Sequence, residues 1–366
     1  MPASEHVCNY INNEWTRGAS GESADVINPA TGELLARVPL GENADVAATV
    51  EAAVAAYPLW RRTPPEERIQ HLFKLKQLME ENFEAISRLV TMENGKTLTE
   101  SRAELRRGIE NVEVACGIPI LMQGYNLEDV ARGIDEFMIR QPLGVVAAIT
   151  PFNFPVMIPL WFLPYAVACG NTFILKPSER VPLAIRRIFE LIEGAGFPPG
   201  VVNLVNGAKP AVDALLAHPQ VRAISFVGSS PVAKYIYARG AELGKRVQSQ
   251  GGAKNHAVVL PDADIETATQ IISDSAFGCA GQRCLAVSVA VTVGAVRRTF
   301  RDAITDAATS IKVGYGIDDE VQMGPVITEE SKSRVEGLVE KGERGRDDSA
   351  GRAGRKDSQP RRGHIH

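Results

Sequence analysis

Short apolar runs rich in Val and Ile recur from residue 144 onward, separated by segments of helix length. They occupy residues 145–150, 171–175, 201–205, 223–227 and 257–260. Strands and helices that alternate in this way form a mostly parallel sheet with helices over both faces. Ligands of such sheets bind beyond the carboxyl ends of the strands, where loops lead into helices. The sequence therefore predicts an α/β fold with its site in those loops.

The first 142 residues are predicted to add short strands, a helical layer and a projecting hairpin. The spacing of apolar residues distinguishes the strands from the helices. Strands are expected at 10–15 and 25–38, and helices at 43–60, 64–93 and 98–115. The alternating segment 125–141, around Arg132-Gly133, predicts a β-hairpin arm. Such an arm often pairs with the edge of another subunit.

Composition and charge limit the class of protein. The 366 residues are 45% hydrophobic, which suits two globular domains with real cores. The net charge of −4, with no long basic run before residue 343, argues against a nucleic-acid partner. The most apolar stretch, 154–169, has 16 residues and three prolines, whereas a membrane span needs about 20 residues. A soluble protein without a membrane partner is expected.

Cysteine usage and the N-terminal sequence predict a cytoplasmic protein. The five cysteines are scattered and odd in number, which favours a reducing compartment without disulfides. No charged region followed by an apolar run begins the chain, so no secretory signal is expected. Cys279 and Cys284 lack metal-ligand spacing and have no His cluster nearby, so no metal site is predicted.

A loop of small residues surrounds these two cysteines, with the sequence Phe277-Gly278-Cys279-Ala280-Gly281-Gln282-Arg283-Cys284. Small residues let backbone amides crowd around a thiol, and the adjacent Arg283 guanidinium would favour the nucleophilic thiolate. Cys284 is therefore a candidate nucleophile. The alternative is that it is a small buried filler, as most free cysteines are.

Three further loops at predicted strand ends carry polar groups. Asn153 could donate its amide to an oxyanion, a contact worth about 3 kcal/mol in a transition state. Lys176 and Glu179 could bind a ribose, and residues 228–230 could bring backbone N–H groups to a pyrophosphate. Each loop also has an ordinary explanation as a turn or a helix cap. The dinucleotide fingerprint G-x-G-x-x-G is absent.

Taken together and in this order, the motifs resemble those of the aldehyde dehydrogenase family. The similarity is close to its coenzyme A-acylating members that act on methylmalonate semialdehyde, and it covers most of residues 1–342. The motifs are Pro151-Phe152-Asn153-Phe154-Pro155, Lys176-Pro177-Ser178-Glu179, Gly252-Ala253-Lys254-Asn255-His256 and Gly281-Gln282-Arg283-Cys284. The resemblance implies a parallel-sheet NAD-binding domain, an α/β catalytic domain and a β-hairpin oligomerisation arm.

The resemblance also implies the catalytic roles. Cys284 would attack the aldehyde, Asn153 and the Cys284 amide would hold the oxyanion of the thiohemiacetal, and hydride transfer to NAD would leave a thioacyl enzyme. The NAD site would be lined by Thr150, Phe152, Lys176, Glu179, Arg180, Ser229 and Gly251.

Gln250 stands where hydrolytic members carry a glutamate base. An uncharged amide cannot deprotonate water efficiently, so the thioester should await another nucleophile, which the resemblance identifies as coenzyme A. Hydrolysis is a weaker alternative that Gln250 opposes.

The resemblance also implies that Arg107 and Arg283 bind the carboxylate of malonate or methylmalonate semialdehyde, as bidentate guanidinium groups can. Arg107 otherwise fits a solvated helix surface.

The products implied by the resemblance are acetyl-CoA or propionyl-CoA, formed with loss of carbon dioxide in valine or inositol catabolism by a homotetramer. The domain boundaries follow from the motifs. They are 1–122 and 143–256 for the NAD-binding domain, 123–142 for the arm, 257–342 for a partial catalytic domain, and 343–366 for a disordered tail foreign to the family.

The tail is the main departure from the family pattern. Residues 343–366 hold seven Lys or Arg, four Asp or Glu, four glycines and one aliphatic residue, a composition typical of disorder. We therefore expect a truncation or frameshift near residue 343. This leaves two classes open: an active acylating dehydrogenase, and an inactive remnant that binds NAD weakly or partners intact subunits.

Overall fold

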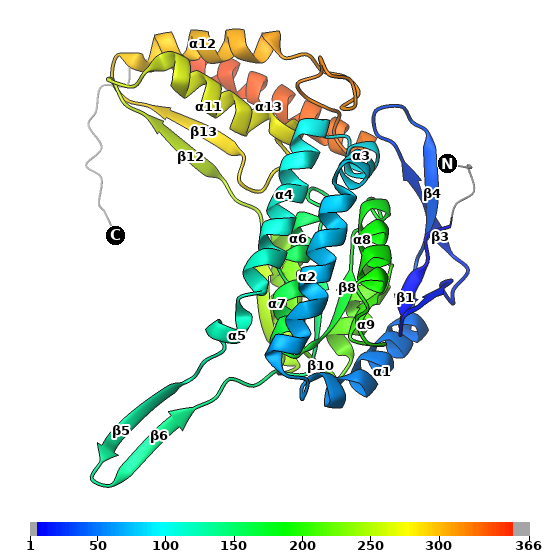
Figure 1. The fold of residues 1–366 in the computed structure, drawn as a ribbon. Coiled ribbons are helices and arrows are strands. Elements are labelled where there is room, and N and C mark those ends of the chain that lie inside the picture. The colour runs from blue at the N-terminus through cyan, green and yellow to red at the C-terminus, as the bar shows by residue number, and fades with distance from the viewer. Residues whose placement is uncertain (1–5, 354–366) are drawn as a thin grey trace. The chain divides into compact units, whose positions relative to one another are not determined.

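The computed structural model describes residues 6–353 (Figure 1). Two compact units divide the chain, Met1–Pro325 and Val326–His366. The larger unit is built on a seven-stranded sheet of order β11-β10-β7-β8-β9-β1-β2. Its strands are β1 (Asn9–Ile11), β2 (Glu14–Thr16), β7 (Val145–Ile149), β8 (Thr172–Lys176), β9 (Val202–Leu204), β10 (Val221–Val227) and β11 (Arg246–Gln250). The strands from β11 to β9 are parallel, which confirms the predicted α/β fold.

The composition of this sheet differs from the prediction in two ways. The polar segment Arg246–Gln250 forms the edge strand β11, because an edge strand with one partner can keep polar side chains in solvent. The predicted run 257–260 instead lies in β12 (Asn255–Val259), which pairs in parallel with β13 (Val287–Thr292) in a separate sheet.

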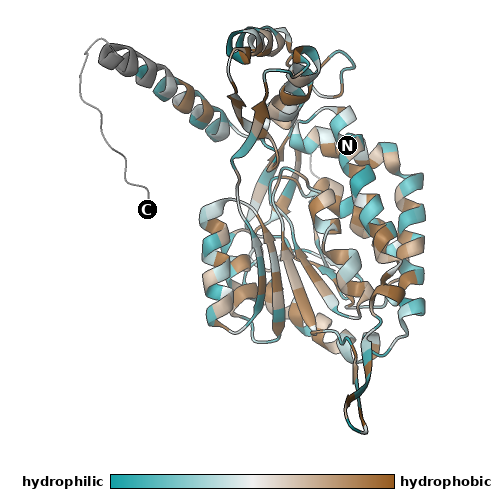
Figure 2. Ribbon diagram, turned by 90° about the vertical axis from the view of Figure 1, so that its left-hand side faces the viewer, coloured by the Kyte–Doolittle hydropathy of each residue, from teal (hydrophilic) through white to brown (hydrophobic). Residues whose placement is uncertain are grey.

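Helices cover both faces of the main sheet. The first face is covered by α2 (Pro65–Glu81), α3 (Phe83–Asn94), α4 (Leu98–Ala115), α6 (Met157–Leu160), α7 (Leu163–Ala168) and α8 (Leu183–Gly194). The other is covered by α1 (Asn43–Trp60), α9 (Lys209–Ala217) and α10 (Ser230–Glu242). Figure 2 shows hydrophobic residues concentrated on the strands and on the helix faces turned toward them.

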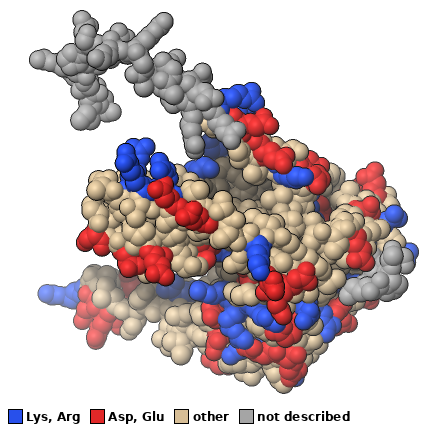
Figure 3. Space-filling model, turned by 90° about the horizontal axis from the view of Figure 1, so that it is seen from above, with Lys and Arg blue, Asp and Glu red and all other residues tan. Residues whose placement is uncertain are grey.

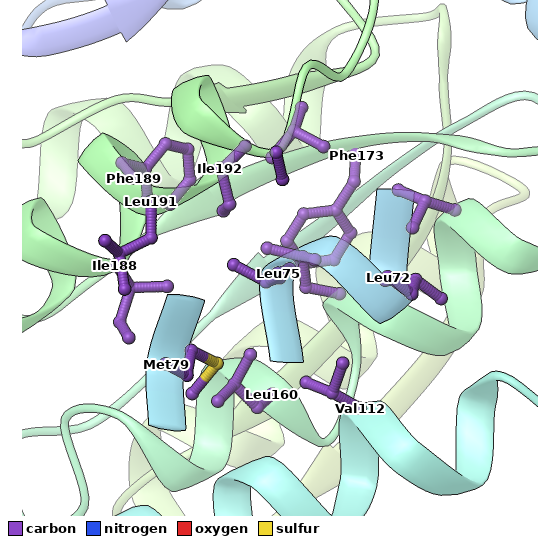
Figure 4. Close-up of a cluster of buried hydrophobic side chains, with 14 of the residues drawn as sticks. Leu72, Leu75, Met79, Val112, Leu160, Phe173, Ile188, Phe189, Leu191 and Ile192 are labelled. Carbon is purple, nitrogen blue, oxygen red and sulfur yellow. The ribbon is translucent and has the colours of Figure 1, made fainter. Parts of the chain in front are cut away.

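A hydrophobic core lies on each face of the main sheet. Successive side chains of a strand point to opposite faces, so alternate strand residues belong to different cores. Ala148 and Leu175 belong to the first, in which Leu72, Leu75 and Phe173 interdigitate (Figure 4). Ala147 and Ile174 belong to the second core, and both are buried.

Residues 64–93 form two helices instead of the predicted one. Asn82 separates α2 from α3, and its side-chain amide donates to the Leu78 carbonyl at 2.7 Å. A short polar side chain that bonds the preceding turn competes with continuation of a helix.

The predicted arm is a hairpin of β5 (Tyr125–Ala131) and β6 (Ile134–Met138), seen at the lower left of Figure 1. Gly133 in its turn has a φ of 73°, a left-handed conformation that glycine adopts without strain. All residues of both strands are exposed, including Phe137 and Leu127. A hairpin with no buried face is only marginally stable in water by itself.

The chain after β12 forms a small lobe of α11 (Ile265–Phe277), the 3₁₀ turn η1 (Gly278–Gly281), β13 and α12 (Val296–Ser310). Val259, Ile272, Val296 and Phe300 form its core. The sequence predicts a strand over 287–293 and a helix over 296–311, and β13 and α12 confirm both.

The smaller unit contains helix α13 (Glu329–Ala353) among its described residues. Residues 343–353 of the predicted disordered tail belong to this helix, and the rest of that prediction, 354–366, lies outside the described residues. Charged segments can be helical because Ala, Arg and Glu are good helix formers. Arg344 also pairs with Glu340 at 3.0 Å, one helical turn away.

Charges of both signs are interspersed on the face of the molecule drawn in Figure 3. Within residues 6–353, none of the helices combines the length and apolar character needed to cross a membrane.

Candidate active site

The sheet brings three of the predicted loops to one edge. Ile149 pairs with Lys176 of β8 and with Phe226 of β10, so β7, β8 and β10 end at the same level. The loops that follow begin at Thr150, Pro177 and Gly228. This is the edge at which ligands bind in parallel α/β sheets.

Cys284 lies in the loop between η1 and β13 and is partly exposed. The loop turns sharply, because Cys279 and Ala280 both have a φ of 52°. Asn255, at the start of β12, donates to the carbonyls of Cys284 at 2.9 Å and Ala286 at 3.0 Å. The backbone that carries the thiol is therefore held by a neighbouring strand.

A cavity of about 850 Å³ opens beside Cys284. Its walls come from α4, from the segment around α6 and from the cysteine loop. Apolar walls are supplied by Phe154, Met157 and Trp161, and both predicted carboxylate-binding residues, Arg107 and Arg283, line it as well. The cavity thus combines apolar walls with cations beside the thiol, and the carboxylates of Glu100, Glu104, Glu110 and Asp274 line it as well. Apolar walls with a few charged groups suit a small polar ligand.

Asn153 is buried next to the cysteine loop. Its side-chain Nδ2 donates to the Gln282 carbonyl at 2.8 Å, while its Oδ1 has no hydrogen-bond partner. An amide nitrogen carries two hydrogens, so this bond leaves the second one for another acceptor. The structure brings Asn153 and Cys284 into one neighbourhood, and the oxyanion role remains a prediction.

Lys96 donates to the backbone of Asn153, a contact that the sequence analysis does not predict. Its Nζ donates to the Asn153 carbonyl at 2.5 Å and to Glu104 Oε2 at 2.6 Å, and lies 4.3 Å from the centre of the Phe154 ring. Burial alone would lower the pKa of Lys96, but nearby Cys279 and Glu104 raise it above its usual value. Lys96 is therefore a buried cation under the Asn153 turn.

Glu100 joins the start of α4 to the cysteine loop. One carboxylate oxygen accepts from the Thr97 N–H at 3.0 Å and completes a capping box. The other accepts from the Cys279 N–H at 2.7 Å and from Arg283 Nη2 at 2.6 Å. Arg283 is therefore engaged by Glu100 and not free to act on the Cys284 thiol alone.

Glu93 and Asn94, at the end of α3, make hydrogen bonds to the start of α8 and to the loop after β7. Glu93 accepts from the N–H groups of Leu183 at 2.6 Å and Ala184 at 2.9 Å, and so caps α8. Burial raises the pKa of Glu93 to about 8. Asn94 donates to the Phe152 carbonyl at 2.8 Å and lies 3.7 Å from Cys279 Sγ.

Residues 93–97 thus contact the loop of Phe152 and Asn153, the start of α8 and the cysteine loop. A signal was present in the sequence: Glu93-Asn94-Gly95-Lys96-Thr97 is a polar run at the end of an apolar helix, with a glycine in the left-handed region. A side chain at Gly95 would also lie 2.8 Å from Pro29.

The predicted NAD-binding residues collect at the same sheet edge. Lys176 is buried, which lowers its pKa, and its Nζ lies 3.3 Å from Glu179 Oε2. Thr150 is buried with no partner for its hydroxyl oxygen. The carbonyl of Phe152 accepts from Asn94, and Arg180 is exposed on the loop after Glu179.

Ser229 and Gly251 both lie at the start of α10. Ser229 occupies the N-cap position without using its side chain as a cap. Gly251 is so close to Ser230 that an added Cβ would lie 3.1 Å from the hydroxyl, and the Gly252 N–H donates to that hydroxyl at 3.0 Å. Two predicted residues from distant parts of the sequence therefore flank one helix N-terminus.

Arg107 and Gln250 occupy more open positions. Arg107 is exposed on α4, with its Nε 3.7 Å from Glu110 Oε2. Gln250 is exposed at the end of β11, and its carbonyl accepts from the Gly228 N–H at 3.0 Å.

The fold and the cavity define a class of α/β protein in which a cysteine loop lies beside the ligand edge of a parallel sheet. The model of the family described as "Aldehyde dehydrogenase family" matches residues 15–366. The chain belongs to the aldehyde dehydrogenase family.

Similar proteins include a malonate-semialdehyde dehydrogenase of Halalkalibacterium halodurans, 48% identical over 365 residues, with 100% of this chain and 75% of the relative covered. The malonate-semialdehyde dehydrogenase 2 of Geobacillus kaustophilus is 50% identical over 336 residues, with 92% and 69% covered.

Solved structures are similar along most of the chain. The methylmalonate-semialdehyde dehydrogenase of Oceanimonas doudoroffii has a TM-score of 0.91 and 46% identity, over 93% of this chain and 70% of that one. A Sinorhizobium meliloti protein, assigned as a methylmalonate-semialdehyde dehydrogenase and solved with NAD, has a TM-score of 0.91 and 43% identity over the same shares.

Proposed function

We propose that this chain oxidises malonate semialdehyde or methylmalonate semialdehyde with NAD and transfers the acyl group to coenzyme A. The observation that carries this is the cavity of about 850 Å³ that Cys284, Arg107 and Arg283 all line. The names of the relatives support the same substrates.

The residues at the sheet edge fit NAD. The unpartnered Thr150 hydroxyl oxygen and the buried Lys176 beside Glu179 supply polar groups for ribose hydroxyls, and the start of α10 at Ser229 suits a pyrophosphate. NAD, when bound, supplies the acceptor for the aldehyde hydride. Phe152, Arg180 and Gly251 would complete the site.

Cys284 acts as the nucleophile in this mechanism. Its thiolate bonds to the aldehyde carbon and forms a thiohemiacetal, whose oxyanion accepts from Asn153 Nδ2 and the Cys284 N–H. Lys96 holds the Asn153 backbone and so keeps this donor in place. Arg107 and Arg283 bind the substrate carboxylate.

Gln250 favours acyl transfer over hydrolysis. After oxidation, Cys284 carries a thioester, and Gln250 cannot remove a proton from water as a glutamate would. The thiolate of coenzyme A then attacks the thioester carbonyl, and Cys284 leaves as thiolate. The substrate loses carbon dioxide in the overall reaction, giving acetyl-CoA or propionyl-CoA.

NADH formation from malonate semialdehyde, with and without coenzyme A, tests this function. Turnover that needs coenzyme A, yields acetyl-CoA and disappears in Cys284→Ala is the expected result. Cys8→Ala, which removes a thiol far from the site in sequence, is the matched control. Turnover without coenzyme A and without acetyl-CoA would support the hydrolytic alternative.

An inactive protein that partners intact copies is the second candidate. The exposed apolar side chains Val258 and Val291 on the β12–β13 sheet, with Phe137 on the arm, favour association with other chains. We infer that the arm serves oligomerisation, in a homotetramer. Absence of turnover from folded protein, with heavier particles on analytical ultracentrifugation, would favour this candidate.

A further inference from the structure

An ion pair stands in the wall of the cavity. Arg283 Nη2 donates to Glu100 Oε1 at 2.6 Å, and both residues line the cavity beside Cys284. Their side chains are 30% and 14% exposed, so the pair is partly removed from water. A charge-assisted bond in such surroundings is stronger than an exposed ion pair.

Glu100 cannot easily move away from this position. Its Oε2 accepts from the Thr97 N–H and the Thr97 hydroxyl, and its Oε1 also accepts from the Cys279 N–H. Both oxygens are therefore fixed by backbone donors, and the negative charge stays in the cavity wall.

Arg283 is confined on its other side by Gly278. A Cβ added to Gly278 would lie 2.3 Å from Cζ of Arg283, so the guanidinium lies directly over this glycine. The same guanidinium reaches the Asp274 carbonyl only at 3.5 Å. Glu100 is thus the short, charged partner of Arg283, and any substrate carboxylate that uses Arg283 must approach Glu100.

We propose, resting on the function proposed above, that Glu100 competes with the substrate carboxylate for Arg283. The competition sets how strongly the site prefers a carboxylate-bearing aldehyde over a neutral one. The substrate must share or take over the guanidinium, and it meets the like charge of Glu100 while doing so. Glu100 therefore limits the affinity for the anion while it holds the cysteine loop.

The ratio of kcat/KM for malonate semialdehyde to kcat/KM for propanal tests this role. A Glu100→Gln substitution removes the charge and is expected to raise the ratio about 10-fold. Glutamine has one carbonyl oxygen and cannot accept from the N–H groups of both Thr97 and Cys279, so the cysteine loop should be held less firmly. We therefore expect kcat/KM to fall for both aldehydes. That loss is common to the two aldehydes and cancels in the ratio.

Glu110→Gln is the matched control, since Glu110 also lines the cavity beside an arginine. Its carboxylate is 51% exposed and 3.7 Å from Arg107, so solvent screens it and the ratio should change less than about 2-fold. An unchanged or lower ratio in Glu100→Gln would overturn the competition, since it would mean that Glu100 only holds Arg283 in place.

A wild-type crystal structure with malonate gives an independent test if Glu100→Gln does not fold. A malonate carboxylate on Arg283, with the Glu100 bond opened, supports the competition. An Arg283 that keeps its bond to Glu100 while malonate binds elsewhere or not at all overturns it. Failure of the proposed function is distinguishable, because it appears as wild-type protein without Cys284-dependent NADH formation.

Discussion

Lys96 donates to the backbone carbonyl of Asn153 at 2.5 Å while its charge is balanced by Glu104. Glu104 in turn accepts from the N–H groups of Val156 at 2.9 Å and Met157 at 3.2 Å. A buried ion pair therefore fixes both ends of the turn that carries the proposed oxyanion donor.

Lys96→Met should lower the free energy of unfolding by about 3–5 kcal/mol, because it leaves Glu104 as an unpaired buried charge. Denaturant titration measures this change. Lys76→Met is the control: the pair of Lys76 with Glu113 is more exposed, so its loss should cost less than about 1 kcal/mol. Equal effects of the two substitutions would show that the Lys96 pair contributes no more than a surface pair.

Asn153→Ala should reduce kcat about 10²–10³-fold with little change in KM, because the proposed donor would act mainly on the oxyanion of the transition state. Steady-state kinetics with malonate semialdehyde measures both constants. Asn126→Ala on the exposed arm is the control and should keep kcat within about 2-fold. A large rise in KM at constant kcat would indicate that Asn153 only binds the ground state.

The pKa of Glu93 predicts how stability varies with pH. Burial raises its pKa from 4.5 to about 8 in the folded protein, so folding is favoured by protonation of Glu93. The contribution is fully present below pH 4.5 and is lost as pH rises toward 8, at about 1 kcal/mol per pH unit.

Glu93→Gln removes this titration, so its free energy of unfolding should fall less between pH 5.5 and 7.5 than that of the wild type. Denaturant titrations at several pH values measure the two slopes. Glu84→Gln is the control, since Glu84 is an exposed carboxylate paired with Arg102. Parallel slopes for wild type and Glu93→Gln would mean that Glu93 is ionised throughout.

Much of the fold follows from local sequence, because short runs rich in Val and Ile, such as 145–150, are typical of parallel strands covered on both faces. The arm and the small lobe follow in the same way. Strand β11 could not be predicted, because Arg246–Gln250 lacks an apolar pattern and is defined by its pairing with β10.

The residues of the candidate site also fall into those that the sequence predicts and those that it does not. Cys284, Asn153 and Arg283 could be predicted from motifs and Arg107 from the family resemblance, whereas the contacts of Lys96 with Asn153 and of Glu100 with Arg283 join residues far apart in the chain. Glu100 meets Arg283 across 183 positions. Periodicity on one helix does not reveal such a contact, and a capping box at Thr97 explains the same glutamate locally.

Gly278→Ala tests whether activity depends on the position of the Arg283 guanidinium, and it does so without changing a charge. The added methyl group would meet the guanidinium at 2.3–2.6 Å, so Arg283 must move from its position over the loop. We expect kcat/KM for malonate semialdehyde to fall at least about 10-fold, with a smaller loss for propanal, because in the proposed mechanism only the charged aldehyde uses the guanidinium.

The matched control is Gly337→Ala, where no atom lies near the added methyl group and both activities should persist. Steady-state kinetics with the two aldehydes and a thermal unfolding scan separate the local effect from a loss of folded protein. Equal losses for both aldehydes in Gly278→Ala would mean that the shape of the cysteine loop, and not the position of Arg283, depends on this glycine.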